Sequence, residues 1–296
     1  MSLALSVVCR GMRYFGKPFF ARLTQVTVAR AGLVAASLAF PLPMGVTARR
    51  AALGGVECLW LTPKEGIGPV LFWLHGGAHV MGSAFTHRGM VGRIAKAAGM
   101  VAVLPDTRLA PEHPAPAGLE DACAAFDGLV ASGVPPERIV LGGDSAGGGL
   151  AAALLSRVEA RGLHVAGLVL LSPWVDLTLS GDSVRTNAAR DPMLPAQAIA
   201  AVVEQIRGAL SPADPRLSPL FARYAGRCPV LITVGTTEIL LDDSQRLAGR
   251  MSDAGAQVTL VRLPFSPHVV AYLAPWVPEA RAEIRRVGEF LRSLAV

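Results

Sequence analysis

The amino-acid sequence predicts an α/β fold, in which a mostly parallel β-sheet carries helices on both of its faces. From residue 56 onward, apolar runs of strand length alternate with runs of helical periodicity, which is typical of parallel strands joined by helical crossovers. Hydrophobic residues make up 52% of the 296 residues and charged residues only 17%, so the chain can fill a core on both faces of such a sheet. This length fits one large domain, or one domain with a lid.

Seven strands and five helices are expected in the alternating region. The strand runs are apolar and are bounded by turn-forming residues, as buried strands are. The last helix is amphipathic, because Ile284, Val287, Leu291 and Leu294 recur at three- and four-residue steps. The expected strands cover 56–62, 69–75, 100–106, 138–144, 166–172, 228–235 and 257–264, and the expected helices cover 87–98, 117–132, 145–161, 241–254 and 278–294.

Two segments depart from this alternation. Residues 1–50 contain seven basic and no acidic residues, whereas residues 51–296 contain 21 basic and 22 acidic residues. Because the body of the protein is neutral, the net charge of +6 does not indicate a nucleic-acid partner. Residues 180–215 are first polar and rich in turn formers and then rich in alanine, which predicts a lid-like insertion after a central strand.

The acid-free N-terminal segment has three interpretations. It is typical of a targeting sequence, of an amphipathic segment at a membrane surface, or of a cap that packs on the body. The apolar run at 29–45 is similar to part of a signal peptide, but it lies far from the N-terminus and two prolines interrupt it. We interpret residues 1–45 as part of a cap, with membrane contact as the alternative.

The cysteines and the longest apolar runs bear on the cell compartment. No stretch of about 18 uninterrupted apolar residues predicts a membrane-spanning helix. Four cysteines lack the paired spacing of a disulfide framework or a zinc site, so reduced thiols and a cytoplasmic location are expected. These cysteines are Cys9, Cys58, Cys123 and Cys228.

A serine nucleophile is expected in LGGDSAGGGLAAALL, residues 141–155. Gly143, Ser145 and Gly147 fit the Gly-x-Ser-x-Gly pattern between an expected strand and an expected helix. Small residues there let strand and helix meet at a sharp turn, and the positive end of the helix favours the alkoxide of Ser145. A glycine-rich turn that binds phosphate is the alternative. Asp144 is expected to support the turn through hydrogen bonds and to point away from the substrate.

The donors for an oxyanion are expected in WLHGGAHVMGS, residues 73–83, directly after a buried strand. Backbone N–H groups of Gly76 and Gly77 can turn toward the nucleophile, and the amide of Ala146 is the expected third donor. His75 is expected to hold this loop by a hydrogen bond. His79 is expected at the surface or in a pocket wall.

The remaining two members of a catalytic triad are expected late in the chain, in the order serine, acid, histidine. His268, in LPFSPHVVAY, is the only histidine after residue 164. Glu238, Asp242 and Asp243 compete as the acid in GTTEILLDDS. Glu238 is chosen because it stands nearest to the strand end, whereas the two aspartates suit the first turn of a helix; Asp242 is the reserve.

With these motifs in place, the chain resembles the hormone-sensitive-lipase-like (bacterial family IV) esterases of the α/β-hydrolase superfamily. The resemblance covers about residues 55–296 and rests on HGGAHVMGS, DTRLAPEHPAPAGLEDA, GDSAGG, LSPWVDL, DPRLSPL and GTTEILLDDS, in the order of that family. It implies an α/β-hydrolase fold with a mostly parallel eight-stranded sheet, helices on both faces and a helical cap. Residues 46–296 would form the catalytic domain, with a second cap element inserted at about 180–215.

The resemblance also implies a function. It implies a serine carboxylesterase that acts on short- to medium-chain acyl esters through a Ser145–His268–Glu238 triad and an acyl-enzyme, without metal or organic cofactor. The substrate would be a small-molecule ester, and the chain could pair as a homodimer through its last strand. Alternatives are a lactone, thioester or amide hydrolase, a membrane-surface lipase, or a receptor on an inactive scaffold. The chain departs from the family at Ala78, where a third glycine is usual, and at Glu238, where aspartate is usual. It also departs at Thr107, where tyrosine is usual, and at Ala115, where an aromatic residue is common.

Overall fold

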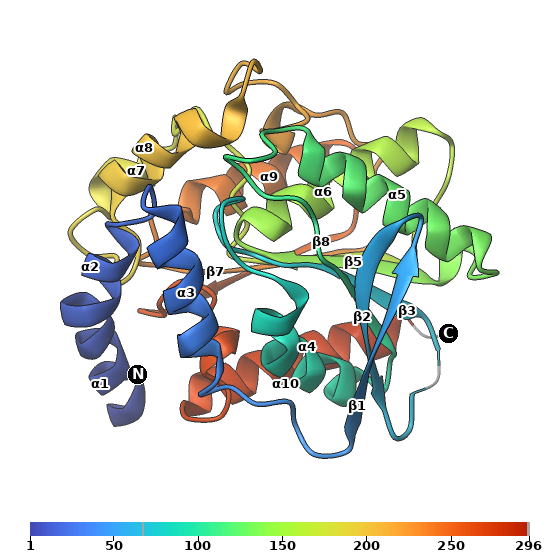
Figure 1. Ribbon diagram of the computed structural model, residues 1–296, viewed down its shortest axis with the longest axis horizontal. Helices are drawn as coiled ribbons and strands as arrows, with labels where there is room; N and C mark the ends of the chain where they lie inside the picture. The colour runs from blue at the N-terminus through green and yellow to red at the C-terminus, as the bar shows by residue number, and fades with distance from the viewer. Residues whose placement is uncertain (67, 295–296) are drawn as a thin grey trace.

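Eight strands form one twisted sheet at the centre of the computed structural model, which describes residues 1–66 and 68–294 (Figure 1). The sheet order is β1-β2-β4-β3-β5-β6-β7-β8. The pairs β1–β2 and β2–β4 are antiparallel, and every pair from β4–β3 to β7–β8 is parallel. The strands are β1 (Val46–Leu53), β2 (Val56–Pro63), β3 (Val70–Leu74), β4 (Ala102–Pro105), β5 (Ile139–Asp144), β6 (Gly167–Leu171), β7 (Val230–Gly235) and β8 (Val258–Leu263).

All seven predicted strands are present, and the predicted α/β-hydrolase sheet is confirmed. The pattern of apolar residues did not reveal β1, because only Val46 and Leu53 at its two ends are buried. An edge strand that faces solvent along most of its length carries no continuous apolar run. β8 forms the opposite edge of the sheet, and pairing of two copies through this strand stays a prediction.

Five long helices cover the two faces of the sheet (Figure 1). Residues of α5, α6 and α9 pack in one apolar cluster on one face, and residues of α4 and α10 pack in a second cluster on the other. This burial on both faces explains why the central strands are uniformly apolar. The helices are α4 (Ala84–Ala98), α5 (Ala117–Ala131), α6 (Ala146–Ala160), α9 (Leu241–Asp253) and α10 (Pro278–Ser293).

The predicted helix boundaries need one correction of note. α4 begins at Ala84, three residues before its predicted start. Ser83 caps the helix by accepting from the Thr86 amide, and the Thr86 hydroxyl accepts from the Ser83 amide. This reciprocal capping box satisfies two backbone donors that the first turn would otherwise leave unpaired.

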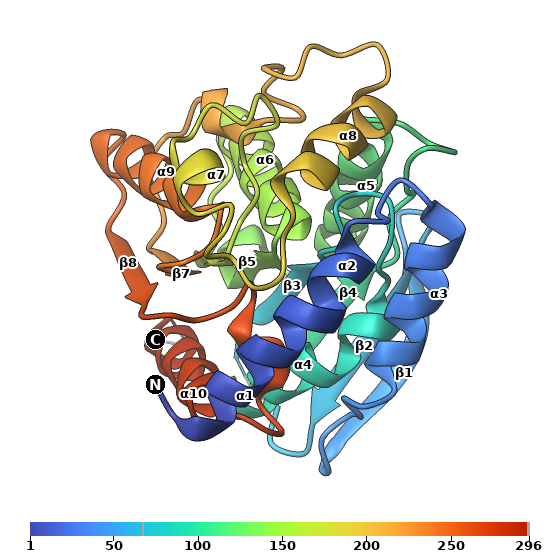
Figure 2. The same ribbon diagram turned by 90° about the vertical axis from the view of Figure 1, so that its left-hand side faces the viewer.

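The N-terminal segment and the insertion pack against each other (Figure 2). The first contains α1 (Leu3–Gly11), a π-helical turn (Met12–Gly16), α2 (Lys17–Phe20) and α3 (Val26–Ser37), and the second contains α7 (Ser183–Thr186) and α8 (Ala196–Arg207). Leu23 and Ala29 share an apolar cluster with Ile199 and Val202. None of the helices in the described ranges combines the length and apolar character that a membrane crossing requires.

Basic side chains fix the N-terminal segment to the body. Arg30 donates to the carbonyl oxygens of Val80 and Ala110 and forms an ion pair with Glu112. Arg13 donates to the carbonyl oxygen of Arg190 at 3.2 Å. Part of the positive charge of this segment therefore binds backbone acceptors of the same molecule.

Candidate active site

The turn between β5 and α6 places Ser145 in an uncommon backbone conformation, with φ 54° and ψ −126°. Such a conformation is costly for a residue with a side chain, and it persists only when the surroundings fix it. Here the backbones around it touch: a Cβ on Gly143 would overlap the carbonyl of Gly147, and a Cβ on Gly147 would overlap the carbonyl of Leu74. The flanking glycines are thus required for the close approach of strand and helix.

The structure brings Ser145, His268 and Glu238 into one hydrogen-bonded chain. His268 Nε2 lies 2.8 Å from Ser145 Oγ, and His268 Nδ1 lies 2.6 Å from Glu238 Oε2. The residue His268 is 5% exposed and Glu238 is fully buried. A buried carboxylate that bonds one ring nitrogen leaves the other nitrogen free to accept the serine proton.

Among the three competing carboxylates, Glu238 is the one that contacts His268. Its other oxygen, Oε1, accepts from the Ser172 hydroxyl at 2.7 Å and from the Gly235 amide at 2.5 Å. Asp242 instead accepts from the amide of Ser183 at 2.8 Å. Asp243 likewise accepts from backbone amides, those of Val175 and Asp176, so both aspartates anchor the chain that leads into the insertion.

The nearby Glu238 carboxylate favours the protonated form of His268. Burial opposes a charged imidazole, but the nearby carboxylate and its hydrogen bond outweigh burial, so the pKa of His268 is raised above its ordinary value. Asp191 and Asp144 contribute in the same direction. The site therefore stabilises the imidazolium that forms when His268 takes a proton.

The loop after β3 faces Ser145 with unusual backbone geometry. Gly77 has φ +124°, and a Cβ there would overlap the carbonyl of Met81; a Cβ on Gly76 would overlap the carboxylate of Asp144. Gly77 and Ala78 line the same cavity as Ser145. Within the described residues, the amides of Gly76, Gly77 and Ala146 donate to no other protein atom, so they remain available to an oxyanion.

Asp144 is among the residues that border the cavity, and hydrogen bonds to other side chains hold its carboxylate, as expected for a supporting residue. Its two oxygens are engaged by Trp73 Nε1 at 3.0 Å and by His87 Nε2 at 3.2 Å. Burial opposes its charge, but His87 and these hydrogen bonds outweigh burial and lower the pKa of Asp144. Trp73 belongs to β3 and His87 to α4, so two separate elements fix the orientation of the carboxylate.

His75 and His79, the two histidines of the loop after β3, do not belong to the hydrogen-bonded chain from Ser145 to Glu238. His75 Nδ1 is 3.0 Å from the carbonyl oxygen of Gly76, within its own loop. His79 packs against Trp174, with ring centroids 6.1 Å apart.

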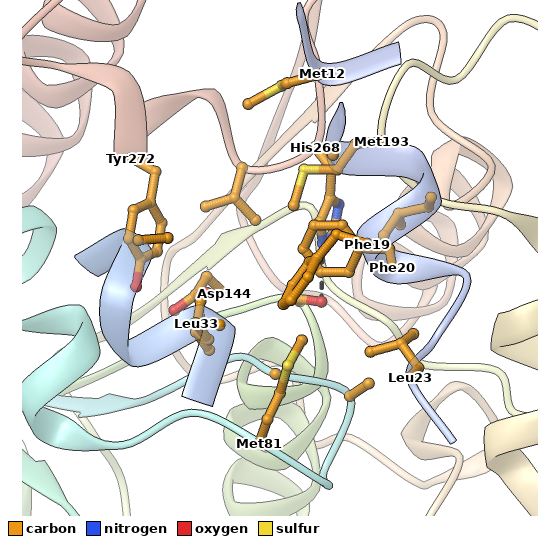
Figure 3. A pocket seen from close by; sticks show the side chains of 18 of the residues that line it. Met12, Phe19, Phe20, Leu23, Leu33, Met81, Asp144, Met193, His268 and Tyr272 are labelled. Carbon is orange, nitrogen blue, oxygen red and sulfur yellow. Dashed lines mark hydrogen bonds between the residues drawn. The ribbon is translucent and has the colours of Figure 1, made fainter. Parts of the chain in front are cut away.

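A mostly apolar cavity of about 420 Å³ opens over Ser145 and His268. Its walls come from three sources: the N-terminal segment, the insertion, and the loops after the strands. Figure 3 shows Met12, Phe19, Phe20 and Met193 around His268. Residues that the sequence did not assign to a site, such as the two phenylalanines, thus form most of the surface that a substrate would meet.

Sequence reasoning also missed Ser172. Its hydroxyl donates to Glu238 Oε1 and accepts from the amide of Val269, the residue after His268. Ser172 thereby connects the acid to the backbone that carries the histidine. One signal was available: Ser172 directly follows β6, the strand between those that precede Ser145 and Glu238.

Comparisons with known proteins find relatives among esterases and other hydrolases. A family model described as an α/β-hydrolase fold matches residues 71–272. The chain is 37% identical to an acetyl-hydrolase of Streptomyces hygroscopicus over 81% of each protein, and 34% identical to an esterase of Acinetobacter venetianus over 86% of this chain and 85% of that one. A crystal structure of an esterase from the bacterial hormone-sensitive lipase family is 37% identical, with a TM-score of 0.92 over 100% of this chain and 99% of the other.

The chain belongs to the hormone-sensitive-lipase-like esterases of the α/β-hydrolase superfamily. It is accordingly a carboxylic ester hydrolase. Its departures from the usual motifs at Ala78 and Glu238 fit the observed site. Ala78 has φ 52°, so it keeps a backbone conformation that glycine adopts easily. Glu238, although longer than aspartate, reaches His268 at 2.6 Å because its carboxylate is held by Ser172 and Gly235.

Proposed function

We propose that the protein hydrolyses short- to medium-chain acyl esters through a Ser145–His268–Glu238 triad and an acyl-enzyme. The observation that carries this proposal is the continuous hydrogen-bonded chain from Ser145 Oγ to the buried Glu238 carboxylate. Residues 1–45 and about 180–215 would act as the two parts of a cap. They contribute apolar walls to the cavity over the serine, which favours uncharged substrates.

The reaction follows from the positions of these groups. His268 Nε2 takes the proton of Ser145 as Oγ attacks the ester carbonyl, and the amides of Gly76, Gly77 and Ala146 donate to the oxyanion. Collapse of this intermediate breaks the bond to the alcohol, which leaves with the proton from His268. A water molecule, deprotonated by His268, then attacks the acyl-enzyme. The bond from Ser145 Oγ to the acyl carbon breaks, His268 returns the proton to Oγ, and the acid leaves.

Initial rates on p-nitrophenyl acyl esters, from acetate to decanoate, test the proposal with wild type and Ser145→Ala side by side. We expect turnover that peaks at short or medium chains and is lost in the variant. Equal turnover in the folded variant, or none in wild type, would reject the triad on these esters. The same pair, assayed on lactones, thioesters and activated amides, measures how far the machinery extends to related carbonyls.

A lipase at a membrane surface is a second candidate, favoured by the distribution of exposed apolar side chains. Of thirteen large apolar side chains exposed among the described residues, nine lie in residues 1–44. Leu3 and Val7, 81% and 62% exposed, share one side of α1. Phe15 is 80% exposed and also lines the cavity, so such a surface would lie beside the entrance.

Flotation with vesicles tests this second candidate. The full chain would float with vesicles of phosphatidylglycerol and phosphatidylcholine, and a Leu3→Ser, Val7→Ser variant would not. Equal flotation of the two proteins would remove the case for α1 as a membrane contact. The cytoplasmic location and the homodimer stay predictions.

A further inference from the structure

The insertion contacts the loop of the triad acid from outside the sheet. Asn187 Nδ2 donates to the carbonyl oxygen of Glu238 at 2.8 Å and to that of Thr236 at 3.3 Å. Asp191 Oδ2 accepts from the amide of Ile239 at 2.9 Å. Two buried side chains of one short segment therefore hold the peptide groups on both sides of the acid.

The second oxygen of Asp191 connects the same carboxylate to the cavity wall. Oδ1 accepts from the amides of Met193 and Leu194 at 2.8 and 2.9 Å, and both residues line the cavity. Asp191 thus bonds the acid loop with one oxygen and the wall with the other. A shift of either segment would break bonds to a fully buried carboxylate, which is costly.

The N-terminal segment also binds the part of the insertion that contains Asp191. Lys17 Nζ donates to the carbonyl oxygens of Ala188 and Asp191, at 2.7 and 2.9 Å. Lys17 is the first residue of α2, and Phe19 and Phe20 of the same helix line the cavity. One lysine therefore connects the N-terminal wall of the cavity to the segment that holds Glu238.

The charges around Asp191 indicate why a carboxylate stands at this position. Asp191 is fully buried near Glu238; burial and that neighbouring charge outweigh its hydrogen bonds and raise the pKa of Asp191. A buried like-charge neighbour costs stability, so its presence points to a role other than stabilising the fold. Three carboxylates, on Glu238, Asp191 and Asp144, act together on His268 and raise its pKa.

We propose that Asp191 and Asn187 are positioning residues for the triad, which hold the Glu238 loop in register with His268, and that Lys17 fixes them to the cap. This inference rests on the proposed triad. It makes the position of the acid depend on the walls of the substrate cavity, because the same hydrogen bonds serve both.

Asp191→Asn is the decisive variant. The amide oxygen keeps the two bonds to Met193 and Leu194, whereas its NH₂ group meets the N–H of Ile239 and cannot accept from it. We expect kcat to fall about 10- to 100-fold, with KM changed less than about threefold, as when a group that orients a catalytic side chain is lost. The acidic limb of kcat/KM should also move to lower pH, because a negative charge near His268 is removed.

The matched control is Asp182→Asn, since that side chain is exposed and forms an ion pair with Arg185 at 3.7 Å on the surface. A second pair probes the cap: Lys17→Met should lower kcat, and Lys17→Arg should retain most of it. A folded Asp191→Asn enzyme with wild-type kcat and pH limb would overturn the proposal. If the Asp191→Asn variant fails to fold, equal kcat values in Lys17→Met and Lys17→Arg would overturn the proposal. Ser145→Ala, run in parallel, shows separately whether the triad itself fails.

Discussion

His268 Nε2 lies 2.8 Å from Ser145 Oγ, although 123 residues separate them. The sheet explains this closeness, because β5, β6, β7 and β8 are consecutive parallel neighbours. Their carboxyl ends lie along one edge, where ligand and catalytic sites of such sheets form. Ser145 follows β5, Glu238 follows β7, and His268 follows β8.

Glu238→Gln should lower kcat by about 10³- to 10⁴-fold, because an amide cannot stabilise the imidazolium of His268. Asp242→Asn is the matched control, since Asp242 bonds the Ser183 amide instead. We expect this control to change kcat by less than about tenfold. Steady-state rates on p-nitrophenyl butyrate measure both. Equal losses in the two variants would show that Glu238 is not the acid.

Activity should fall on the acidic side at a pH above the ordinary pKa of histidine. The pKa of His268 is raised, because Glu238 outweighs the effect of burial. As pH falls through this raised pKa, the imidazole takes a proton and can no longer accept one from Ser145. The midpoint of the acidic limb of kcat/KM against pH measures this pKa. A midpoint at or below about 6.5, the usual histidine value, would contradict this expectation.

Gly77→Ala should lower kcat about 100-fold, as when an oxyanion donor is lost. A Cβ at φ +124° would overlap the backbone carbonyl of Met81, so the loop must move. Gly249→Ala in α9 is the control, because nothing lies within 4 Å of a Cβ there. It should leave kcat unchanged and stabilise the fold by about 1 kcal/mol. Steady-state kinetics and thermal unfolding are measured on both variants. An unchanged kcat in Gly77→Ala would argue against this loop as a donor to the oxyanion.

Gly32→Ala should shift the preferred acyl chain to shorter lengths. A Cβ on Gly32 would overlap the ring of Phe19, which can swing into the cavity that both residues line. We expect rates on the longest accepted ester to fall about tenfold, with little change on acetate. Gly11→Ala, where nothing lies within 4 Å of a Cβ, should keep the wild-type profile. A uniform loss across the ester series would mean that Phe19 does not limit chain length.

Short-range patterns were sufficient for much of the site. The turn at Ser145 and the loop at Gly76 and Gly77 are local structures, so their glycines appear side by side in the sequence. The acid was harder to choose, because Glu238 and Asp242 are only four residues apart. Their side chains point to different partners, His268 and the Ser183 amide. The supporting role of Asp144 was predictable, but its partners Trp73 and His87 were not, because they lie far from it in the sequence.

The sequence by itself determined the fold class, seven of the eight strands, and the positions of Ser145, Glu238 and His268 after strands β5, β7 and β8, because apolar periodicity and glycine-rich turns are local properties of the chain. Only the tertiary structure decided which side chains contact Glu238 and its loop and which line the cavity. Ser172, Asn187, Asp191 and Phe19 act through residues far away in the chain, and such contacts exist only after parallel strands and the two cap segments have packed together.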